Sequence, residues 1–234
     1  MSHHHSKKRR IATAVVIAVA VYWVIAYVAA PLAWEVYAAW RPSFDDDPRI
    51  TRTSDGHPGD PLNVAIYGEE ASLQSIMEKA GWHPAAALGL RSDLRIADDT
   101  LLSRPDDDAP VSNLYLYGRK EDLAFEQPVG HNPRQRHHVR FWKTSRSDAD
   151  NRPLWIGSAS YDERVGLSDT TGQITHHISG DIDAERDHLF ADLKATGRLL
   201  EDDPVAGFHT ELEGRNGGGD RWHTDGSLYV GTID

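Results

Sequence analysis

Residues 62–81 read LNVAIYGEEASLQSIMEKAG, and the change of pattern within them indicates the fold class. The first six residues form an apolar run closed by Gly68, which is typical of a short buried strand. Apolar residues then recur at helical spacing over 70–80, and Gly81 follows where a helix commonly ends. A strand that leads directly into an amphipathic helix predicts a domain in which a sheet packs against helices.

The chain beyond this segment repeats both patterns. Helices are predicted at 93–102, which Ser92 can cap, and at 183–196, where acidic residues near the N-terminus suit the helix dipole. The two helix endings LQSIMEKAGW and LFADLKATGR resemble each other, which is compatible with a duplicated, ferredoxin-like arrangement. We therefore expect an α+β fold, a mixed sheet with two or three packed helices. Alternating apolar and polar residues predict strands at 113–118, 123–127, 137–143, 154–161, 173–179, 208–213 and 227–233.

Residues 11–34, IATAVVIAVAVYWVIAYVAAPLAW, contain no charged side chain. A helix rises 1.5 Å per residue, so about 20 residues cross a bilayer core of about 30 Å, and this run is long enough to be a transmembrane helix. A cleaved signal peptide is the alternative. Its apolar region is usually about 7–15 residues long, and here Pro31 follows the small residues at which cleavage would occur. We expect an uncleaved, single-pass anchor.

The residues that flank this anchor predict its orientation. KKRR at 7–10 precedes the anchor, whereas acidic residues dilute the basic ones after it, so the positive-inside rule places the N-terminus in the cytoplasm. The expected organisation is a cytoplasmic basic tail at 1–10, a transmembrane anchor at 11–34, a linker rich in proline, glycine and polar residues at 35–61, and an extracytoplasmic domain at 62–234. The expected location is the plasma membrane.

The charge of the chain is divided between its two ends. Four basic residues precede the first acidic residue, Glu35, and the sequence from Glu35 onward contains 21 basic and 36 acidic residues, a formal net charge of −15. A domain this acidic does not favour nucleic acid as a partner, because neutralising phosphates requires a basic face. The chain contains no cysteine, which fits an exported protein that needs no disulfides.

Four long motifs occur in order between residues 112 and 193: SNLYLYGRKEDLAFEQPVG, NPRQRHHVRFWKT, PLWIGSASYDERVGLS and GQITHHISGDIDAERDHLFADL. On these motifs the chain resembles the LssY C-terminal domain family over about residues 60–200. The resemblance implies a bacterial envelope setting, because modules of this kind occur joined to membrane proteins of the type-2 phosphatidic-acid phosphatase and DedA kinds. It implies no reaction and transfers no catalytic residue to this sequence.

Two His-His pairs are the most concentrated chemical feature of the predicted strands. Alternation along a strand places His137 on one face and His138 on the other, and it separates His176 from His177 in the same way. Since His137 and His176 have apolar neighbours two residues away, we expect them to face the core. His138 and His177 would then share the opposite face of one sheet with Arg140. The alternative is that all four are hydrogen-bonded, partly buried histidines that stiffen the sheet.

These histidines, with nearby carboxylates, are also candidates for metal binding and acid–base chemistry. A zinc site needs three or four ligands, and acidic residues that follow the second His-His pair could complete one, although the spacing matches no standard metal motif. The alternative for these acids is that they begin a helix. The metal candidates, for a divalent ion, are His138, His177 and Asp181, and the catalytic candidates are His138, His177, Asp183 and Glu185.

A basic cluster stands out in this acidic domain. Guanidinium groups bind phosphate and carboxylate groups through paired hydrogen bonds, so the cluster predicts a site for an anionic ligand, and salt bridges to the many acids are the alternative. Two function classes follow. The first is a non-catalytic envelope module that binds a protein, a phospholipid-related partner or a phosphate-containing ligand, and the second is a histidine- or metal-dependent hydrolase of an envelope phosphoester. The ligand-binding candidates are Arg134, Arg136, Arg140, His137 and His176.

Overall fold

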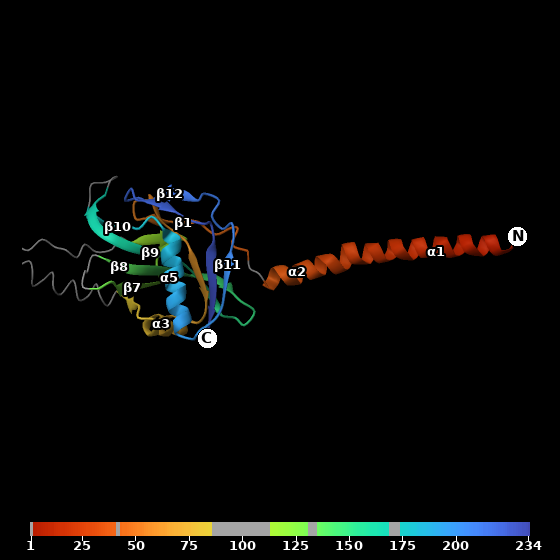
Figure 1. The fold of residues 1–234 in the computed structure, drawn as a ribbon, viewed down its shortest axis with the longest axis horizontal. Helices are drawn as coiled ribbons and strands as arrows, with labels where there is room; N and C mark the ends of the chain where they lie inside the picture. Colours follow the sequence, from red (N-terminus) through yellow and green to blue (C-terminus); the bar gives the residue numbers. More distant parts are fainter. Residues whose placement is uncertain (1, 41–42, 86–112, 131–134, 169–173) are drawn as a thin grey trace, which may run out of the picture. The chain divides into compact units, whose positions relative to one another are not determined.

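The computed structural model describes residues 2–40, 43–85, 113–130, 135–168 and 174–234 (Figure 1). The chain forms two compact units, Met1–Phe44 and Asp45–Asp234. The first unit is helical and consists of α1 (Ser2–Val24), the π-helical turn η1 (Ile25–Ala29) and α2 (Ala30–Trp40). The second unit contains the sheets, with helices α3 (Glu70–Lys79) and α5 (Ile182–Ala195).

The helical unit contains one segment, Arg9–Trp34, that is long and apolar enough to cross a membrane, and none of it is buried inside the protein. This segment could anchor the protein in a membrane, as predicted for residues 11–34. The π-helical turn ends at Ala29, two residues before Pro31. Because proline has no backbone N–H to donate, a local change in the hydrogen-bond ladder is expected at this point.

The second unit is built on a mixed main sheet. Its strand order is β11-β14-β3-β9-β8-β7-β4, and β14 runs parallel to β3 while the other pairs are antiparallel. The long strand β9 pairs with β3 through its first half and with β10 through its second half. The strands are β3 (Val64–Tyr67), β4 (His83–Pro84), β7 (Leu123–Pro128), β8 (Arg136–Ser147), β9 (Pro153–Leu167), β10 (Ile174–Ile178), β11 (Leu199–Val205) and β14 (Leu228–Ile233).

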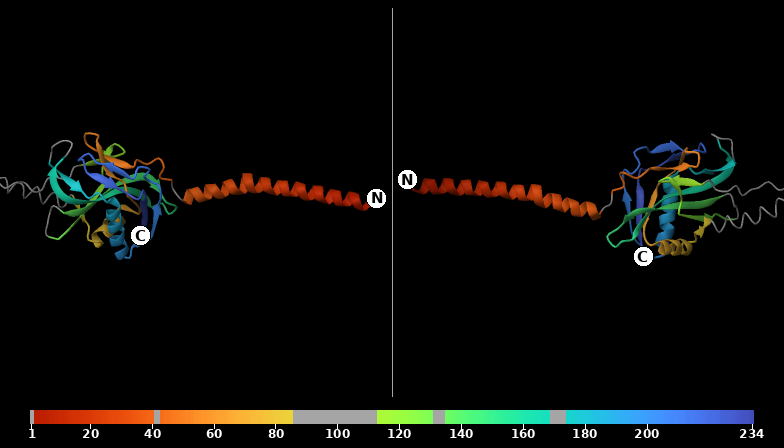
Figure 2. Two further views of the ribbon diagram at one scale, coloured as in Figure 1. Left: turned by 45° about the horizontal axis from the view of Figure 1, so that its top comes forward. Right: turned by 180° about the vertical axis from the view of Figure 1, so that it is seen from behind.

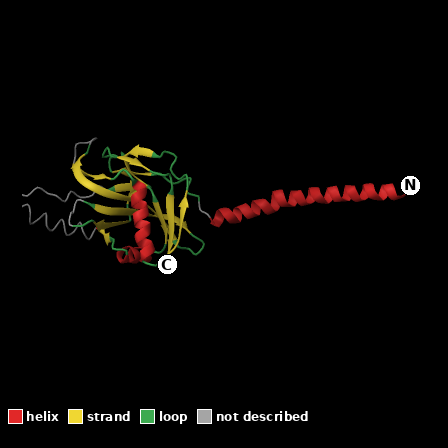
Figure 3. Ribbon diagram, in the orientation of Figure 1, coloured by secondary structure: helices red, strands yellow, loops and turns green. Residues whose placement is uncertain are grey.

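Helices α3 and α5 cover one face of this sheet (Figure 3). Alternate residues of β3, β8 and β9 point toward the helices, because successive side chains of a strand lie on opposite faces. Each fully buried aliphatic side chain contributes about 1.5–3 kcal/mol to the hydrophobic stabilisation. The core consists of Val64, Ile66, Leu73, Ile76, Met77, Trp82, Phe125, Val139, Phe141, Trp155, Ala159, Leu189, Phe190, Leu193 and Ile233.

Two smaller sheets lie over the other face of the main sheet. One has the order β2-β1-β5-β6, and the other is the hairpin of β12 and β13. Strands β1 and β12 lie together at one end of this unit in each view (Figures 1 and 2). Asn216, in the turn after β12, donates from Nδ2 to Oδ1 of Asp60 in β2 at 3.4 Å. The strands are β1 (Ile50–Thr53), β2 (Pro58–Pro61), β5 (Leu114–Leu116), β6 (Arg119–Lys120), β12 (Glu213–Arg215) and β13 (Arg221–His223).

The predicted α+β class is confirmed, and so are helices α3 and α5. The predicted boundary between the linker and the folded domain was wrong. Strands β1 and β2 lie inside the predicted linker at 35–61, and the compact unit begins at Asp45 rather than at residue 62. The strand predicted at 208–213 is wrong except at its last residue, because β12 begins at Glu213, and β11 was not predicted. The predicted helix at 93–102 lies outside the described residues.

The ferredoxin-like expectation agrees with the sheet only in part. In a β-α-β-β-α-β duplication, crossover-linked strands are parallel and hairpin strands antiparallel, so the last strand runs antiparallel to the first. Strands β14, β3, β9 and β8 are neighbours in the corresponding order, with two helices on one face. Strand β14, however, runs parallel to β3. The edge of the sheet formed by β11 and β14 therefore differs from the edge of a ferredoxin-like sheet.

Candidate functional site

The face of the main sheet away from the helices is polar and buried. Alternation along β8 puts the basic side chains of Arg136, His138 and Arg140 on this face, while Val139 and Phe141 face the helices. Strand β9 contributes three short polar side chains to the polar face. Asp162, Ser160 and Ser158 lie directly opposite Arg136, His138 and Arg140 of β8. The polar side chains buried there are Asp60, Glu126, His138, Arg140, Ser158, Ser160 and Asp162.

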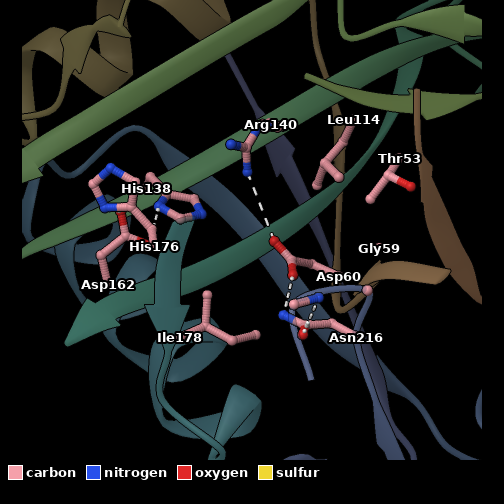
Figure 4. Close-up of a pocket in the computed structure, with 12 residues that line it drawn as sticks. Thr53, Gly59, Asp60, Leu114, His138, Arg140, Asp162, His176, Ile178 and Asn216 are labelled. Atoms are coloured by element: carbon pink, nitrogen blue, oxygen red, sulfur yellow. Dashed lines mark hydrogen bonds and ion pairs between the residues drawn. The ribbon is translucent and has the colours of Figure 1, made fainter. Parts of the chain in front are cut away.

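A cavity of about 80 Å³ lies between this polar face and the smaller sheets (Figure 4). Figure 4 shows the side chains of Arg140 and Asp60 on one side and the two imidazoles with Asp162 on the other. The β12–β13 turn closes the cavity from a segment distant in sequence. The lining residues are Thr53, Gly59, Asp60, Leu114, His138, Arg140, Asp162, His176, Ile178, Asn216, Gly217 and Gly218.

Asp162 is the centre of this site and is fully buried. Its Oδ1 lies 3.2 Å from Nδ1 of His138, and its Oδ2 lies 3.1 Å from Nδ1 of His176 and accepts a 3.2 Å hydrogen bond from Nε of Arg136. The contacts with His138 and His176 are ion-pair contacts whose angles are not those of a hydrogen bond. Burial alone would raise the pKa of Asp162, but the charge of His138 and the imidazole N–H groups of His138 and His176 beside it hold that pKa well below its usual value.

The hydrogen bonds also assign the protons of both imidazoles. Arg136 Nη2 lies 3.0 Å from Nε2 of His176. A guanidinium can only donate, so this Nε2 accepts and the proton of a neutral His176 is on Nδ1, toward Asp162. His138 presents Nδ1 to Asp162 in the same way, and its Nε2 lies 2.7 Å from Oγ of Ser160. One carboxylate therefore orients two histidines.

The charges of the site nearly balance. Arg136 also donates to Glu126 at 3.2 Å, and Nη1 of Arg140 lies 3.8 Å from Oδ2 of Asp60. Two guanidinium groups thus face three carboxylates, those of Asp60, Glu126 and Asp162. The site has a net charge of −1 when both imidazoles are neutral and +1 when both are protonated.

The histidine that joins His138 is His176, and the prediction that it would be His177 was wrong. Strand β9 has an extra residue opposite the step from His177 to Ile178, since His177 pairs with Arg164 and Ile178 pairs with Asp162. This bulge changes the alternation of β9 relative to β10. Ile178 and His176 consequently line the polar cavity, although apolar neighbours had suggested a core position. His177 is bound instead by Asp220, with Nδ1 2.6 Å from Oδ1.

The remaining candidates lie in other places. His137 is on the helix side of the sheet, where its Nδ1 is 2.7 Å from Oε2 of Glu185, and its ring stacks on His188 with centroids 4.0 Å apart. Asp183 binds Arg186, Thr224 and the backbone N–H of Asp225. These contacts connect elements of the fold and do not reach the cavity.

The predicted metal ligands do not meet. Asp181 caps α5 by accepting from the backbone N–H of Ala184 at 3.1 Å, so this acid begins a helix, as the alternative interpretation had it. His138 and His177 have Asp162 and Asp220 as their separate partners. Across the residues that the structure describes, no group of three or more His, Cys, Asp and Glu side chains could hold a metal ion. Arg134 lies outside the described residues.

Sequence reasoning missed Ser160, Asp162, Asp60 and Glu126. A signal was present in the segment 158–162, SASYD, where polar residues alternate with Ala159 and Tyr161 in the middle of a mainly apolar strand. The same period of two places Arg136, His138 and Arg140 on one face of the preceding strand. Two neighbouring strands that each have one polar face predict a shared polar layer.

Comparison with known protein families identifies one match. The family model described as LssY C-terminus matches residues 44–228, which include every described residue of the cavity. Comparisons with curated proteins and with solved structures gave no match. The matched range begins close to Asp45, the first residue of the compact unit.

Proposed function

The chain belongs to the LssY C-terminus family, and from that premise we propose that its domain binds a phosphate-containing anion in the cavity on the polar face of the main sheet. The apolar segment Arg9–Trp34 would hold this domain at a membrane, with the domain outside the cytoplasm. The observation that carries the proposal is that Arg140, His138 and His176 line one cavity. Of these side chains, the guanidinium of Arg140 is the hydrogen-bond donor suited to phosphate oxygens.

The source of the phosphate group follows from the setting of the domain. A membrane anchor would keep the chain at a membrane, where lipid headgroups are available, and free phosphate offers the same chemistry. The formal charge of −15 on the sequence from Glu35 onward disfavours nucleic acid as a source. Inorganic phosphate and a short-chain phosphatidic acid are the two probes that separate these sources.

Calorimetric titration of the full chain in detergent tests this proposal. Arg140→Gln should weaken binding of either probe at least tenfold, because a hydrogen bond to a charged group contributes about 1.5–3 kcal/mol. Arg146→Gln is the matched control, since Arg146 lies on the same strand and pairs with Asp47 away from the cavity. Binding that is absent at pH 6, or equally weakened in both variants, would contradict the proposal. Tighter binding of phosphatidic acid than of phosphate would identify a lipid headgroup.

The hydrolase predicted as a second function draws support from a different observation. The described residues offer no three-ligand metal site, but His138 joins a serine hydroxyl to a buried carboxylate. Histidine-dependent chemistry on a phosphoester is thus favoured over a metal-dependent version of the same reaction.

A further inference from the structure

Ser160 and His138 are directly opposed residues on the neighbouring antiparallel strands β9 and β8. Opposed side chains on one face lie about 4.5–5.5 Å apart at Cβ, which lets the serine hydroxyl reach the imidazole. Ser160 Oγ lies 2.7 Å from Nε2 of His138. Asp162 is two residues further along β9, so it lies on the same face and contacts Nδ1 of that imidazole at 3.2 Å. The three side chains form a line from hydroxyl to imidazole to carboxylate.

Ser158, two residues earlier on the same face, shows what an ordinary structural serine does in this sheet. Its Oγ donates a 2.7 Å hydrogen bond to the backbone carbonyl of Pro61, which satisfies the hydroxyl and ties β9 to β2. The neighbours of Ser160 are titratable instead. They are His138 at 2.7 Å and Oδ2 of Asp60 at 3.4 Å, and the shorter distance favours His138 as acceptor of the hydroxyl proton.

The protonation state required of a general base follows from the contacts of His138. Asp162 is fully buried and ionised, because its pKa is held well below the usual value. It therefore favours the tautomer with the proton on Nδ1, which leaves the Nε2 lone pair directed at Ser160. The imperfect alignment between His138 and Asp162 is common in sites without substrate, where such bonds tighten once the reacting groups are bound.

We propose that Ser160 is the nucleophile of a phosphoester hydrolase, with His138 as general base and acid and Asp162 as the residue that positions His138. The proposal rests on the phosphate site proposed above and names what that site does to its ligand. Arg140 lines the same cavity as His138, and its guanidinium donors suit the charged oxygens of a phosphoryl group. Asp60 and His138 both line the cavity and both contact Ser160, so the hydroxyl adjoins the cavity lining.

The reaction balances with water as the only second substrate. Ser160 Oγ attacks phosphorus while its proton passes to Nε2 of His138, and the phosphorus–oxygen bond to the leaving alcohol breaks. The departing alkoxide takes the proton from His138, which leaves a phosphoryl group on Ser160. Water then attacks phosphorus and gives its proton to His138, the bond to Ser160 breaks, and Oγ recovers the proton. The products are an alcohol and a phosphate with one ester bond fewer. Asp162 stabilises the imidazolium that forms in each half.

A fluorophosphonate tests the nucleophile without knowledge of the natural substrate, because an activated serine attacks its phosphorus and displaces fluoride. The full chain in detergent should acquire one adduct on Ser160, located by peptide mass spectrometry. His138→Gln should slow labelling at least a hundredfold, since a general base contributes about 10²–10⁴-fold. Ser158→Ala, the matched control, should label at the wild-type rate. Absence of an adduct on Ser160, or equal labelling in His138→Gln, would overturn the proposal.

Turnover and binding separate this proposal from the one on which it rests. Hydrolysis of bis(p-nitrophenyl) phosphate should be lost in Ser160→Ala and kept in Ser158→Ala. Calorimetric phosphate binding should survive in Ser160→Ala, because this change removes only a hydroxyl, and it also shows that the variant is folded. If phosphate binds to the wild type but Ser160 is never labelled, the binding function stands and the nucleophile is refuted. If p-nitrophenyl acetate is cleaved and the phosphodiester is not, the phosphoester assignment is wrong.

Discussion

Nδ1 of His176 lies 3.1 Å from Oδ2 of Asp162, and the bulge in β9 is what brings them together. Without the extra residue in β9, alternation along β10 would place His177 instead of His176 beside this carboxylate. The result is a buried anion held between two imidazoles and the guanidinium of Arg136. A fully buried carboxylate requires such partners, because an unpaired charge in the interior is strongly unfavourable.

We expect Asp162→Asn to lower the free energy of unfolding by about 3–5 kcal/mol, the usual cost of removing one partner from a buried ion pair. The measurement is denaturant unfolding of the full chain in detergent, followed by the fluorescence of buried Trp142 and Trp155. Asp150→Asn is the control, because Asp150 forms an ion pair with Arg152 but its side chain is 73% exposed. That change should cost at most about 1 kcal/mol. Equal effects of the two substitutions would contradict the role assigned to Asp162.

The low pKa of Asp162 also predicts how stability depends on pH. A carboxyl whose folded pKa lies below its unfolded value contributes stability above the unfolded pKa, about 3.9, and loses it as pH falls through the folded pKa. The wild type should therefore lose stability progressively below about pH 4. Asp162→Asn should show a shallower loss over the same range in acid unfolding curves. Parallel curves for the two proteins would mean that Asp162 is not the group that titrates.

The limits of the sequence-based prediction follow from the same geometry. Period-two alternation correctly separated His137 from His138, because β8 and β9 pair in regular register from Arg136 to Lys143. It failed for His176 because one extra residue in the partner strand is not visible in the sequence of β10. Asp60 was assigned to a linker, since β2 contains two prolines and a glycine and resembles a loop. The positions of His176 and Asp60 depend on how strands distant in the sequence pair with each other, and the local sequence pattern does not reveal that pairing.

Gly157 should not tolerate a side chain. It lies where β9 pairs with β3 on one edge and β8 on the other, and a Cβ there would come within 2.6 Å of the backbone oxygen of Arg140 and 2.8 Å of the Phe141 ring. Gly157→Ala should destabilise the domain by about 1–3 kcal/mol through overpacking, measured by thermal unfolding. It should also weaken phosphate binding, because the displaced strand holds Arg140. An unchanged melting temperature would show that the strands separate without cost.

Membrane attachment should depend on the apolar character of Arg9–Trp34. Each arginine at the centre of a transmembrane helix costs about 2.5–3.5 kcal/mol on the insertion scale. The double substitution Val15→Arg with Val19→Arg should therefore move the full chain from the carbonate-washed membrane pellet toward the supernatant. Val36→Arg, which lies beyond this segment, is the control and should stay in the pellet. Recovery of the uncleaved wild-type chain in the supernatant would refute the anchor.

Asn63 links the fold to the site, and its substitution provides the last prediction. Its side chain is fully buried between β9 and α5. Nδ2 donates to the carbonyl oxygens of Ala159 and Ile182, both at 2.9 Å, and Oδ1 accepts from the N–H of Ala159 at 2.8 Å. Asn63 thus satisfies three backbone groups, two of which belong to the residue that directly precedes Ser160.

The substitutions Asn63→Ala and Asn63→Asp should lower the stability of the domain by different amounts. Asn63→Ala leaves three buried polar groups without their partner, and the loss of stability should be at least about 3 kcal/mol, since each orphaned group costs about 1–3 kcal/mol. Asn63→Asp keeps an acceptor for the N–H but turns a carboxylate toward two carbonyl oxygens, so it should cost more than the alanine variant at pH 7. Protonation of that carboxyl restores one donor, and the gap between the two variants should narrow as the pH falls toward 5. Denaturant unfolding at pH 7 and pH 5 measures both effects. An aspartate variant as stable as the wild type at pH 7 would show that Asn63 does not bridge β9 and α5 in this way.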